Sequence, residues 1–441
     1  MIQKIRIFNY LCIYDMTIDL TCADLRKPPH YEDYEMLLYV QQGKRKTRTR
    51  NNRIVPVLSL YGANASGKTT VLKAVMQLQS IVAGGLISGS FQPNRIKLYP
   101  QENRYTEFEI EFWKHGDKYD YLLKYDNERI VKELLRKNET DIFVVENNTI
   151  CQLSDVDTER PYIEKEYRTR CINITNSCQI KSFLSEITRA YPGTSLSMSL
   201  ALDYMLNDIM VLADNRIEVW TGINKLASVY GSDLTEEERV DRAVKEIVEY
   251  LGKLDSGIVA LDYHKEYYSS EPMGKILSSN VNADPDRLEI IEKDRFIANS
   301  VTSIHKSETG NDVRFKLSSE SKGTKLLMGL LGVLLYSIKS GKTILVDELD
   351  ESMHSLLLIQ LVRLFKEKRL NTCSQIIFTA HNTDLIAADL LSLYEIGIVR
   401  YDKKQGSCFS RLADNPEAKS SRNIRKLYLD GYFGGIPFPF V

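Results

Sequence analysis

The chain has 441 residues, of which 43% are hydrophobic and 27% charged, the composition of a folded globular protein rather than a disordered one. Its 58 Lys and Arg residues balance 59 Asp and Glu residues, so no overall charge points to a polyanionic partner. The apolar runs are too short for a membrane span, and the first residues, MIQKIRI, resemble a strand rather than a signal peptide. The seven scattered cysteines include no CxxC pair, which argues for reduced thiols. We therefore expect a cytoplasmic protein without a membrane segment.

The first 135 residues alternate between strand and helix patterns. Apolar and polar residues alternate at both ends of this region, and an apolar strand in its middle runs into a glycine-rich loop. The predicted elements are two strands within 2–20 with a turn near Tyr14-Asp15, strands at 53–60, 105–112 and 119–125, and a helix at 71–81.

The pattern changes after about residue 135. Residues 180–254 are mainly helical, and one helix has a capping box from Thr235 to Glu238 and ends at Gly252. Strand and helix patterns alternate again from residue 313, with strands at 313–317, 343–346 and 375–380 and helices at 324–338 and 353–367. The sequence therefore predicts a split α/β domain with an N-terminal lobe at 1–135, a mainly helical insertion at 136–312 and a C-terminal lobe at 313–441.

A phosphate-binding loop follows the strand at 53–60. Its sequence, GANASGKT, matches the G-x-x-x-x-G-K-[ST] pattern at every fixed position and precedes a helix. Small residues let the backbone N–H groups close around phosphates, the lysine reaches the β and γ phosphates, and the threonine hydroxyl binds Mg²⁺. The predicted ATP-binding residues are Gly62, Asn64, Ala65, Ser66, Gly67, Lys68, Thr69 and Thr70.

Two acids end the apolar strand Ile344-Leu345-Val346. In this position Asp347 would hold Mg²⁺ together with Thr69, and Glu348 would polarise the attacking water. A strand that ends in Asp-Glu is a weak signal alone, but here it follows a complete phosphate-binding loop. The prediction is therefore a metal role for Thr69 and Asp347 and a catalytic role for Glu348.

Two flanking segments narrow the class of ATPase. Upstream, the segment SSESKGT (318–324) opens a helix with a Ser-x-Gly turn, which presents a hydroxyl and backbone donors to a phosphate but would also serve as an ordinary helix cap. Downstream, the strand at 375–380 ends at His381, a position from which a histidine could bond the γ-phosphate.

The order of these motifs resembles the ABC-type ATPases of the SMC/RecF/OLD branch. The closer resemblance is to the bacterial "AAA15" ATPases related to RloC, which are associated with phage defence and restriction. It rests on both ends of the chain, and no motif matches within residues 140–300. The matching segments are RIFNY (6–10), YGANASGKT (61–69), SSESKGT (318–324), VDELDESMH (346–354), TAHNTDL (379–385) and RKLYLDGYFGGIPF (425–438).

The resemblance implies an α/β P-loop ABC-type head that binds ATP and Mg²⁺ between two copies of itself. Ser321 and Gly323 would contact the γ-phosphate held by the partner copy, and His354 would lie at the dimer seam. His381 would be the switch histidine and act in catalysis. The signature departs from the transporter form LSGGQ, because Glu320 replaces leucine and Thr324 replaces glutamine. Two glutamines could serve as the Q-loop residue, Gln92 and Gln101.

The densest basic run is Lys44 to Arg50, followed by Arg53. Clustered basic side chains can neutralise nucleic-acid phosphates, but such a run is more commonly a solvated hairpin. The sequence therefore leaves nucleic acid open as a partner of the Lys44–Arg53 segment.

Three functions compete on these data. The first is a regulatory ATPase whose ATP-driven homodimerisation, alone or within a larger oligomer, controls a separate effector such as a nuclease in anti-phage defence. The second is a RecF-like DNA-associated repair ATPase. The third, an ATP-dependent scaffold without turnover, is disfavoured by the intact Asp347-Glu348 pair and His381.

Overall fold

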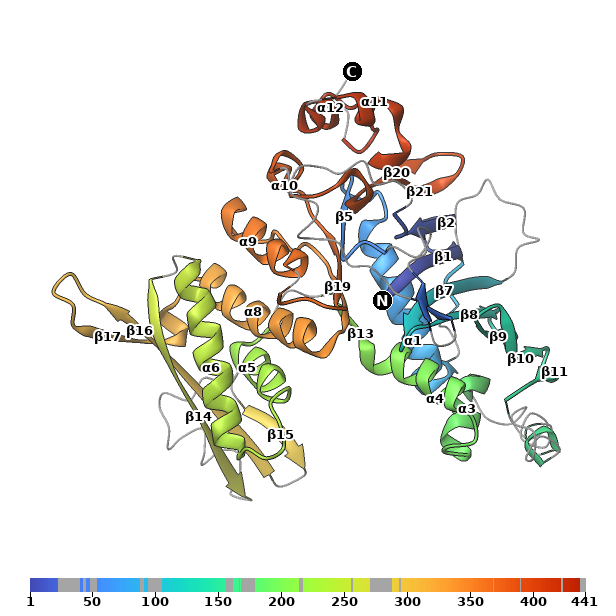
Figure 1. Ribbon diagram of the computed structural model, residues 1–441, viewed down its shortest axis with the longest axis horizontal. Coiled ribbons are helices and arrows are strands. Elements are labelled where there is room, and N and C mark those ends of the chain that lie inside the picture. The colour runs from blue at the N-terminus through green and yellow to red at the C-terminus, as the bar shows by residue number, and fades with distance from the viewer. Residues whose placement is uncertain are drawn as a thin grey trace. The chain divides into compact units, whose positions relative to one another are not determined.

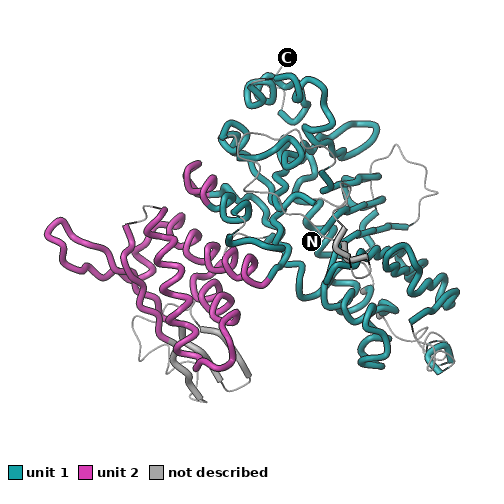
Figure 2. The backbone as a smooth tube through the Cα atoms, viewed as in Figure 1, with its two compact units in different colours: residues 1–213, 341–351, 361–441 teal, residues 214–340, 352–360 magenta. Residues whose placement is uncertain are grey.

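The computed structural model describes residues 1–22, 40–42, 45–47, 54–87, 91–93, 105–155, 162–165, 167, 179–213, 217–254, 257–269, 288–292, 295–367, 369–388, 390–421 and 423–436. The chain divides into two compact units (Figure 2). The P-loop unit comprises residues 1–213, 341–351 and 361–441, and the signature unit comprises residues 214–340 and 352–360.

One large sheet forms the framework of the P-loop unit. Its described part has 13 strands in the order β11-β10-β9-β8-β7-β1-β2-β21-β20-β5-β19-β18-β13 (Figure 1). From β11 to β20 neighbouring strands are antiparallel. These strands are β1 (Ile2–Tyr10), β2 (Ile13–Asp19), β7 (Thr106–Lys114), β8 (Asp117–Tyr125), β9 (Ile130–Lys137), β10 (Thr140–Glu146), β11 (Thr149–Leu153), β20 (Ile396–Asp402) and β21 (Gly406–Arg411).

The other part of the sheet is parallel. Next to β20 the sheet continues with four parallel strands. They are β5 (Val57–Tyr61), β19 (Gln375–Thr379), β18 (Thr343–Val346) and β13 (Ile209–Leu212). β5, β18 and β19 are buried along their whole length, as expected for strands covered on both faces. The fold is therefore mixed α/β, as the sequence predicts.

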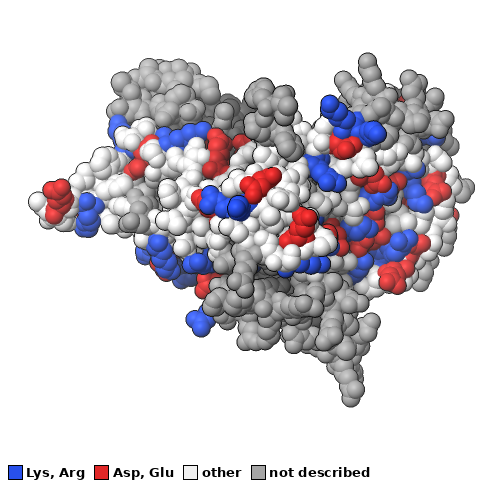
Figure 3. Space-filling view, turned by 90° about the horizontal axis from the view of Figure 1, so that it is seen from above, with Lys and Arg blue, Asp and Glu red and all other residues white. Residues whose placement is uncertain are grey.

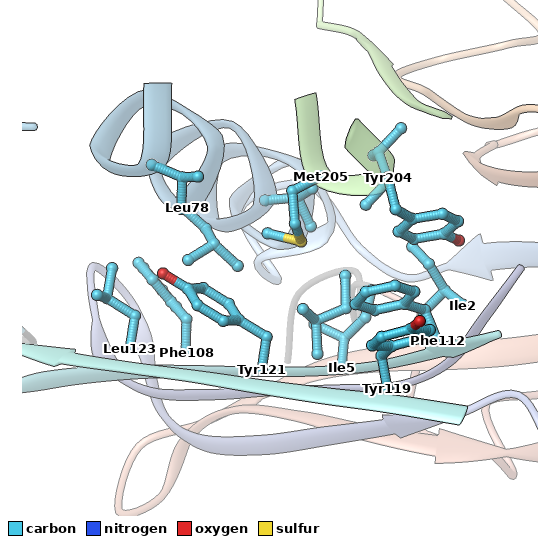
Figure 4. Packing of buried hydrophobic residues seen from close by; sticks show 14 of the residues in the cluster. Ile2, Ile5, Leu78, Phe108, Phe112, Tyr119, Tyr121, Leu123, Tyr204 and Met205 are labelled. Carbon is cyan, nitrogen blue, oxygen red and sulfur yellow. The ribbon is translucent and has the colours of Figure 1, made fainter. Parts of the chain in front are cut away.

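Helix α1 (Lys68–Gly84) and the π-helical turn η2 (Tyr204–Asp208) pack over the antiparallel strands (Figure 4). Leu78 of α1 and Met205 lie above the side chains of β1, β7 and β8 (Figure 4). Phe112 stacks on Tyr204 with ring centroids 4.1 Å apart and on Tyr119 at 5.3 Å. This aromatic core holds the helix that follows the phosphate-binding loop against the sheet.

Shorter elements complete the P-loop unit. They are β3 (Val40–Gln42), β4 (Arg45–Thr47), β6 (Leu86–Ile87), β12 (Gln179–Ile180), α3 (Phe183–Ala190), α4 (Leu196–Asp203), α10 (Asp384–Ala387), η5 (Leu393–Glu395), η6 (Leu412–Asp414), α11 (Pro416–Ser420) and α12 (Ile424–Leu429). Helix α9 (Ser355–Lys366) begins in the signature unit and ends in the P-loop unit.

The signature unit combines helices with a small antiparallel sheet. The sheet has β16 (Arg295–Lys306) paired with β14 (Ile258–Ser269), β15 (Leu288–Glu292) and β17 (Asp312–Lys316). The helical elements are α5 (Val219–Ala227), α6 (Glu236–Lys253), η4 (Leu317–Ser319) and α8 (Lys322–Ser340).

Helices α5 and α8 of this unit approach closely because glycines face each other. A Cβ at Gly222 would lie 2.3 Å from the carbonyl oxygen of Gly329, and a Cβ at Gly332 would lie 2.6 Å from Gly222. The glycines therefore permit a backbone contact that no other residue would allow.

Two sequence predictions differ from the structure. The first hairpin turns at Leu11-Cys12, and Tyr14 and Asp15 lie inside β2, so the predicted turn position was wrong. The Leu11 N–H donates to the Gln92 carbonyl oxygen at 3.0 Å, a contact with a distant segment that no local pattern reveals.

The insertion also differs from its prediction. Residues 136–153 belong to β9, β10 and β11 of the large sheet, and the compact units divide after residues 213 and 340 rather than at 135 and 312. The helical pattern holds for α3 to α6, including the Thr235–Glu238 capping box, and not for β14, β15 and β16. Apolar and polar residues do not alternate regularly along those strands, so the strand pattern is weak.

Basic and acidic side chains lie interspersed over the described residues on the face drawn in Figure 3. Within the large sheet, Lys4 and Lys118 both pair with Glu111. The side chains of the basic Lys44–Arg53 segment lie outside the described residues. Among the helices that are described, none is both long and apolar enough to cross a membrane.

Candidate functional site

Three parallel strands of the P-loop unit end at one edge of the sheet. The phosphate-binding loop follows β5, the Asp347-Glu348 pair follows β18, and His381 lies two residues beyond β19. The strand order β5-β19-β18 places the His381 segment between the other two. Loops at the carboxyl ends of parallel strands are the usual place for a ligand in such sheets.

Glycines at both ends of the loop allow its close packing. A Cβ on Gly62 would lie 2.1 Å from the Val399 carbonyl oxygen of β20, so no larger residue fits there. Gly67 begins α1 with a left-handed φ of 106°, and a Cβ there would lie 2.4 Å from Ser407 Oγ. The loop thus packs against the hairpin of β20 and β21, which lies near the C-terminal end of the sequence.

The side chain of Lys68 turns back into the phosphate-binding loop. Its side chain is only 6% exposed, and its ammonium donates to the carbonyl oxygens of Gly62 at 2.8 Å and Ala63 at 3.1 Å. Burial lowers the pKa of Lys68, while the nearby carboxylates of Asp347 and Glu348 act in the opposite direction. The loop therefore encloses a positive charge whose two carbonyl partners an anionic phosphate oxygen could replace.

Asp347 is held between two threonines. Thr379 Oγ1 donates to Asp347 Oδ1 at 2.6 Å, and Thr69 Oγ1 donates to the same oxygen at 3.2 Å. Asp347 is buried, so this arrangement orients a carboxylate and a hydroxyl toward one point. The Thr69 hydroxyl and the Asp347 carboxylate are the kind of oxygen ligands that Mg²⁺ takes beside phosphates.

Glu348 and His381 both line the cavity beside the loop. Glu348 is exposed and adopts a left-handed φ of 47°, and its N–H donates to Thr379 Oγ1 at 2.7 Å. Asp350 accepts the N–H groups of His381 at 2.7 Å and Asn382 at 2.6 Å. Asp350 therefore fixes the backbone of the segment that carries His381.

The cavity has a volume of about 1080 Å³ and is lined by both polar and apolar residues. Ser66, which is 2% exposed, belongs to the lining, and its Oγ has no hydrogen-bond partner among the described residues. Such an orphan donor in a loop of small residues fits a bound phosphate. The lining residues are Leu11, Cys12, Asn64, Ala65, Ser66, Gly67, Lys68, Thr69, Thr70, Phe91, Gln92, Pro93, Glu348, His381 and Tyr401.

The structure brings one of the two Q-loop candidates to this cavity. Gln92 lines it, and its carbonyl oxygen accepts the Leu11 N–H at 3.0 Å. Gln101 lies outside the described residues. Leu11, Phe91 and Tyr401 contribute apolar and aromatic surface to the cavity, the kind of surface on which a nucleobase stacks.

The predicted signature residues belong to the signature unit, whereas Lys68 belongs to the P-loop unit. Ser321 is exposed and caps α8, because its Oγ accepts the Thr324 N–H at 3.0 Å. A Cβ on Gly323 would lie 2.7 Å from the Ser352 carbonyl oxygen, so this position requires glycine. His354 is also exposed and accepts the Leu356 N–H at 3.3 Å.

The P-loop unit has a mixed sheet, with a phosphate-binding loop after one parallel strand and an Asp-Glu pair after another. In the signature unit, the signature turn opens α8. This arrangement is a mixed α/β fold with a P-loop.

Comparison with known proteins bears on the C-terminal part of the head. A family model described as "AAA domain, putative AbiEii toxin, Type IV TA system" matches residues 220–387. The match includes the signature turn, the Asp347-Glu348 pair and His381, and it begins after the phosphate-binding loop. No curated protein sequence matches the chain.

Among solved structures, several SMC heads are similar to this head. An SMC head bound to the C-winged helix domain of ScpA is 13% identical, with a TM-score of 0.45 and coverage of 93% of this chain and 96% of that one. The SMC head domain from Thermotoga maritima is 13% identical, with a TM-score of 0.40 and coverage of 93% and 98%. The Smc head with an extended coiled coil bound to the C-terminal domain of ScpA from Pyrococcus furiosus is 12% identical, with a TM-score of 0.39 and coverage of 94% and 98%.

Sequence reasoning assigned no role to two residues that organise the site. Thr379 is buried and bonds both Asp347 and the Glu348 backbone. Asp350, which follows the neighbouring strand β18, accepts the His381 backbone N–H. Both lie within the segments VDELDESMH and TAHNTDL, but only the pairing of β18 with β19 shows that they face each other.

Proposed function

We propose that this protein is an ATPase whose heads dimerise on ATP and Mg²⁺. The observation that carries the proposal is that Lys68, Thr69 and Glu348 line one cavity, while Asp347 is in direct contact with Thr69. This set of groups has one common use in proteins, the binding and hydrolysis of a nucleoside triphosphate.

The loop would bind the phosphates through its backbone and its lysine. Lys68 would exchange its carbonyl partners Gly62 and Ala63 for β and γ phosphate oxygens, and Thr69 and Asp347 would hold Mg²⁺. When bound, Mg²⁺ neutralises charge on those phosphate oxygens. The other proposed ATP-binding residues are Gly62, Asn64, Ala65, Ser66, Gly67 and Thr70, with Ser321 and Gly323 from the partner copy.

Glu348 would act as the group that orients and polarises water. Glu348 lines the cavity, and its backbone N–H donates to Thr379 Oγ1, which holds the main chain at this position. His381, which also lines the cavity, would donate to the γ-phosphate oxygen that becomes more negative during cleavage.

The signature turn supports dimerisation as the functional step. Ser321 is exposed at the start of a long helix, and its hydroxyl and the first N–H groups of α8 form a donor set suited to a phosphate. Since ABC-type heads use this turn on the partner's nucleotide, we propose that ATP joins two copies of this chain. Hydrolysis at Glu348 would then separate them.

We further propose that the dimer regulates a separate effector in anti-phage defence, a nuclease being the favoured class. Two features support this step: the resemblance of the motifs to defence-associated ATPases, and the family match, whose description refers to a toxin–antitoxin system.

The first test compares Glu348→Gln with the matched control Glu351→Gln, which removes the same charge three residues away at an exposed position. Loss of a positioned general base lowers turnover by about 10²–10⁴-fold, so Glu348→Gln should release almost no phosphate and remain dimeric with ATP and Mg²⁺. Glu351→Gln should behave as the wild type. Wild-type turnover by Glu348→Gln would refute the proposed role.

A second experiment addresses the effector. Tagged Glu348→Gln protein is purified from its own locus with its neighbouring genes, with and without ATP, and its native mass is measured. An ATP-dependent doubling with a neighbouring protein attached supports effector regulation. Doubling without a partner, together with DNA-stimulated hydrolysis by the wild type, would favour a DNA-associated ATPase instead.

A further inference from the structure

The residue before the signature serine is a glutamate where transporter signatures have leucine. The structure provides a reason for the difference. The Glu320 side chain is only 11% exposed, and its Oε1 lies 2.7 Å from His305 Nε2 and accepts the Ser303 hydroxyl. Because an ionised carboxylate only accepts hydrogen bonds, both Ser303 and His305 Nε2 donate to it.

Both partners of Glu320 come from one strand. Ser303 and His305 are two residues apart on β16, so their side chains leave the same face of the sheet. Ser303 is fully buried, and the His305 ring packs edge-on against Phe315 of β17 with centroids 5.1 Å apart. The glutamate is thus bonded to a packed part of the small sheet rather than to solvent.

β16 is the central strand of that sheet. It pairs with β14 from Ile258 to Ser269, with β15 from Leu288 to Glu292, and with β17 from Asp312 to Lys316. A strand of its length spans about 40 Å. A displacement of this sheet would therefore be transmitted to Glu320.

The signature turn is anchored on both sides of Ser321. Glu320 holds it to β16 on one side, and Gly323 packs against the Ser352 carbonyl oxygen on the other. The Glu320 N–H also donates to Leu317 O at 3.0 Å, which closes the turn that precedes the serine. These contacts hold the backbone on both sides of Ser321, whose own hydroxyl accepts the Thr324 N–H.

We propose that Glu320 is a positioning residue that holds the signature turn on β16 and so presents Ser321 to the nucleotide of a partner copy. This inference rests on the proposed ATP-driven dimerisation. The small sheet then has a defined role. A displacement of β14 to β17 would move the signature turn through the Glu320 carboxylate and so change the contact of Ser321 with the partner copy's nucleotide.

The first test needs no nucleotide. Hydrogen exchange is measured at the Thr324 and Lys325 amides, which donate to the Ser321 hydroxyl and carbonyl oxygens. Glu320→Ala should speed their exchange at least about tenfold, since it removes two charge-assisted hydrogen bonds. Glu320→Gln keeps an acceptor oxygen and should stay close to the wild type. The matched control is Asp312→Ala, which removes the exposed ion pair with Lys306 from the same sheet and should have no effect.

The second test measures ATP-dependent dimerisation in the Glu348→Gln background. Glu320→Ala should bind a fluorescent ATP analogue as the parent does but need at least about tenfold more protein to dimerise, with Glu320→Gln restoring most of the difference. Melting curves exclude unfolded variants. Weaker ATP binding and dimerisation by the same factor would reveal a general structural defect and overturn the positioning role.

The two proposals fail in different ways. If the Glu348→Gln parent does not dimerise with ATP, the proposed function fails, and the exchange experiment still decides whether Glu320 holds the turn. If the parent dimerises and Glu320→Ala matches Asp312→Ala in both exchange and dimerisation, the Glu320 proposal fails alone.

Discussion

Thr69 and Asp347 lie 278 residues apart in the chain, and Thr69 Oγ1 donates to Asp347 Oδ1 at 3.2 Å. Thr379 donates to the same carboxylate oxygen from the strand between them. The contact joins the start of α1 to the end of β18 and places both expected Mg²⁺ ligands together before any ion is bound.

Asp347→Asn should make ATP binding almost independent of Mg²⁺. The amide keeps the contacts with both threonines in one orientation but loses the negative charge that a divalent cation needs. We expect the gain in ATP affinity on adding Mg²⁺ to fall at least about tenfold, measured by calorimetry with and without EDTA. An unchanged Mg²⁺ effect would show that the ion is held elsewhere.

Lys68→Met should abolish the rise in melting temperature that ATP causes in the wild type. The matched control is Lys73→Met, on the exposed face of the same helix. Loss of charge-assisted bonds to phosphate should weaken ATP binding about 10–100-fold, whereas the control should bind normally. Normal ATP stabilisation in Lys68→Met would contradict the role of the loop.

The same substitution should not lower the melting temperature of the nucleotide-free protein at neutral pH. Burial lowers the pKa of Lys68, so the charged form disfavours folding below that pKa. Stability relative to Lys68→Met therefore rises as the pH climbs through the lowered pKa toward the usual lysine range. Melting curves of the wild type and Lys68→Met at neutral and alkaline pH test whether the difference between their melting temperatures becomes smaller as the pH rises.

Lys366→Met should destabilise the P-loop unit strongly. Lys366 and Glu395 form an ion pair at 2.6 Å with side chains only 4% and 3% exposed, so removal of the lysine leaves a buried carboxylate without its charge partner. The expected loss is about 3–5 kcal/mol in denaturant unfolding. The contrasting control is Lys253→Met, from the exposed pair with Glu249, which should leave the unfolding free energy close to that of the wild type. Equal losses would contradict the effect of burial.

Asp120→Asn should stabilise the protein at neutral pH and not in acid. Burial, then the neighbouring carboxylates of Glu109 and Glu111, raise the pKa of Asp120 to about 6, and Arg136 acts against them. A raised carboxyl pKa means that wild-type stability is present below the unfolded value and declines as the pH rises through about 6. The variant should gain about 2 kcal/mol near pH 7.5 and nothing below pH 4. A gain that is constant with pH would contradict this account.

The phosphate-binding loop and the Asp-Glu pair could be located from the sequence because their chemistry depends on local constraints. Gly62 and Gly67 are needed where backbone and side chains crowd the loop, and Lys68 and Thr69 follow at a spacing set by the start of one helix. Apolar runs likewise predicted β5, β18 and β19, since strands buried on both faces carry no polar alternation.

The first hairpin and the small sheet were not predictable in this way. The turn at Leu11-Cys12 uses a positive φ at a leucine and a bond to Gln92, neither of which a propensity shows. Strands β14 to β16 lack a regular apolar alternation and pair with each other, so only the assembled sheet reveals them.

The sequence by itself determined which residues carry the chemistry, because phosphate and metal binding require particular side chains at fixed local spacing. Only the tertiary structure decided which residues hold them in place. Thr379 on Asp347, Asp350 on the His381 backbone and Glu320 on β16 are contacts between segments that meet through strand pairing and packing. Such hydrogen bonds depend on strand register and burial, which the local sequence pattern does not specify.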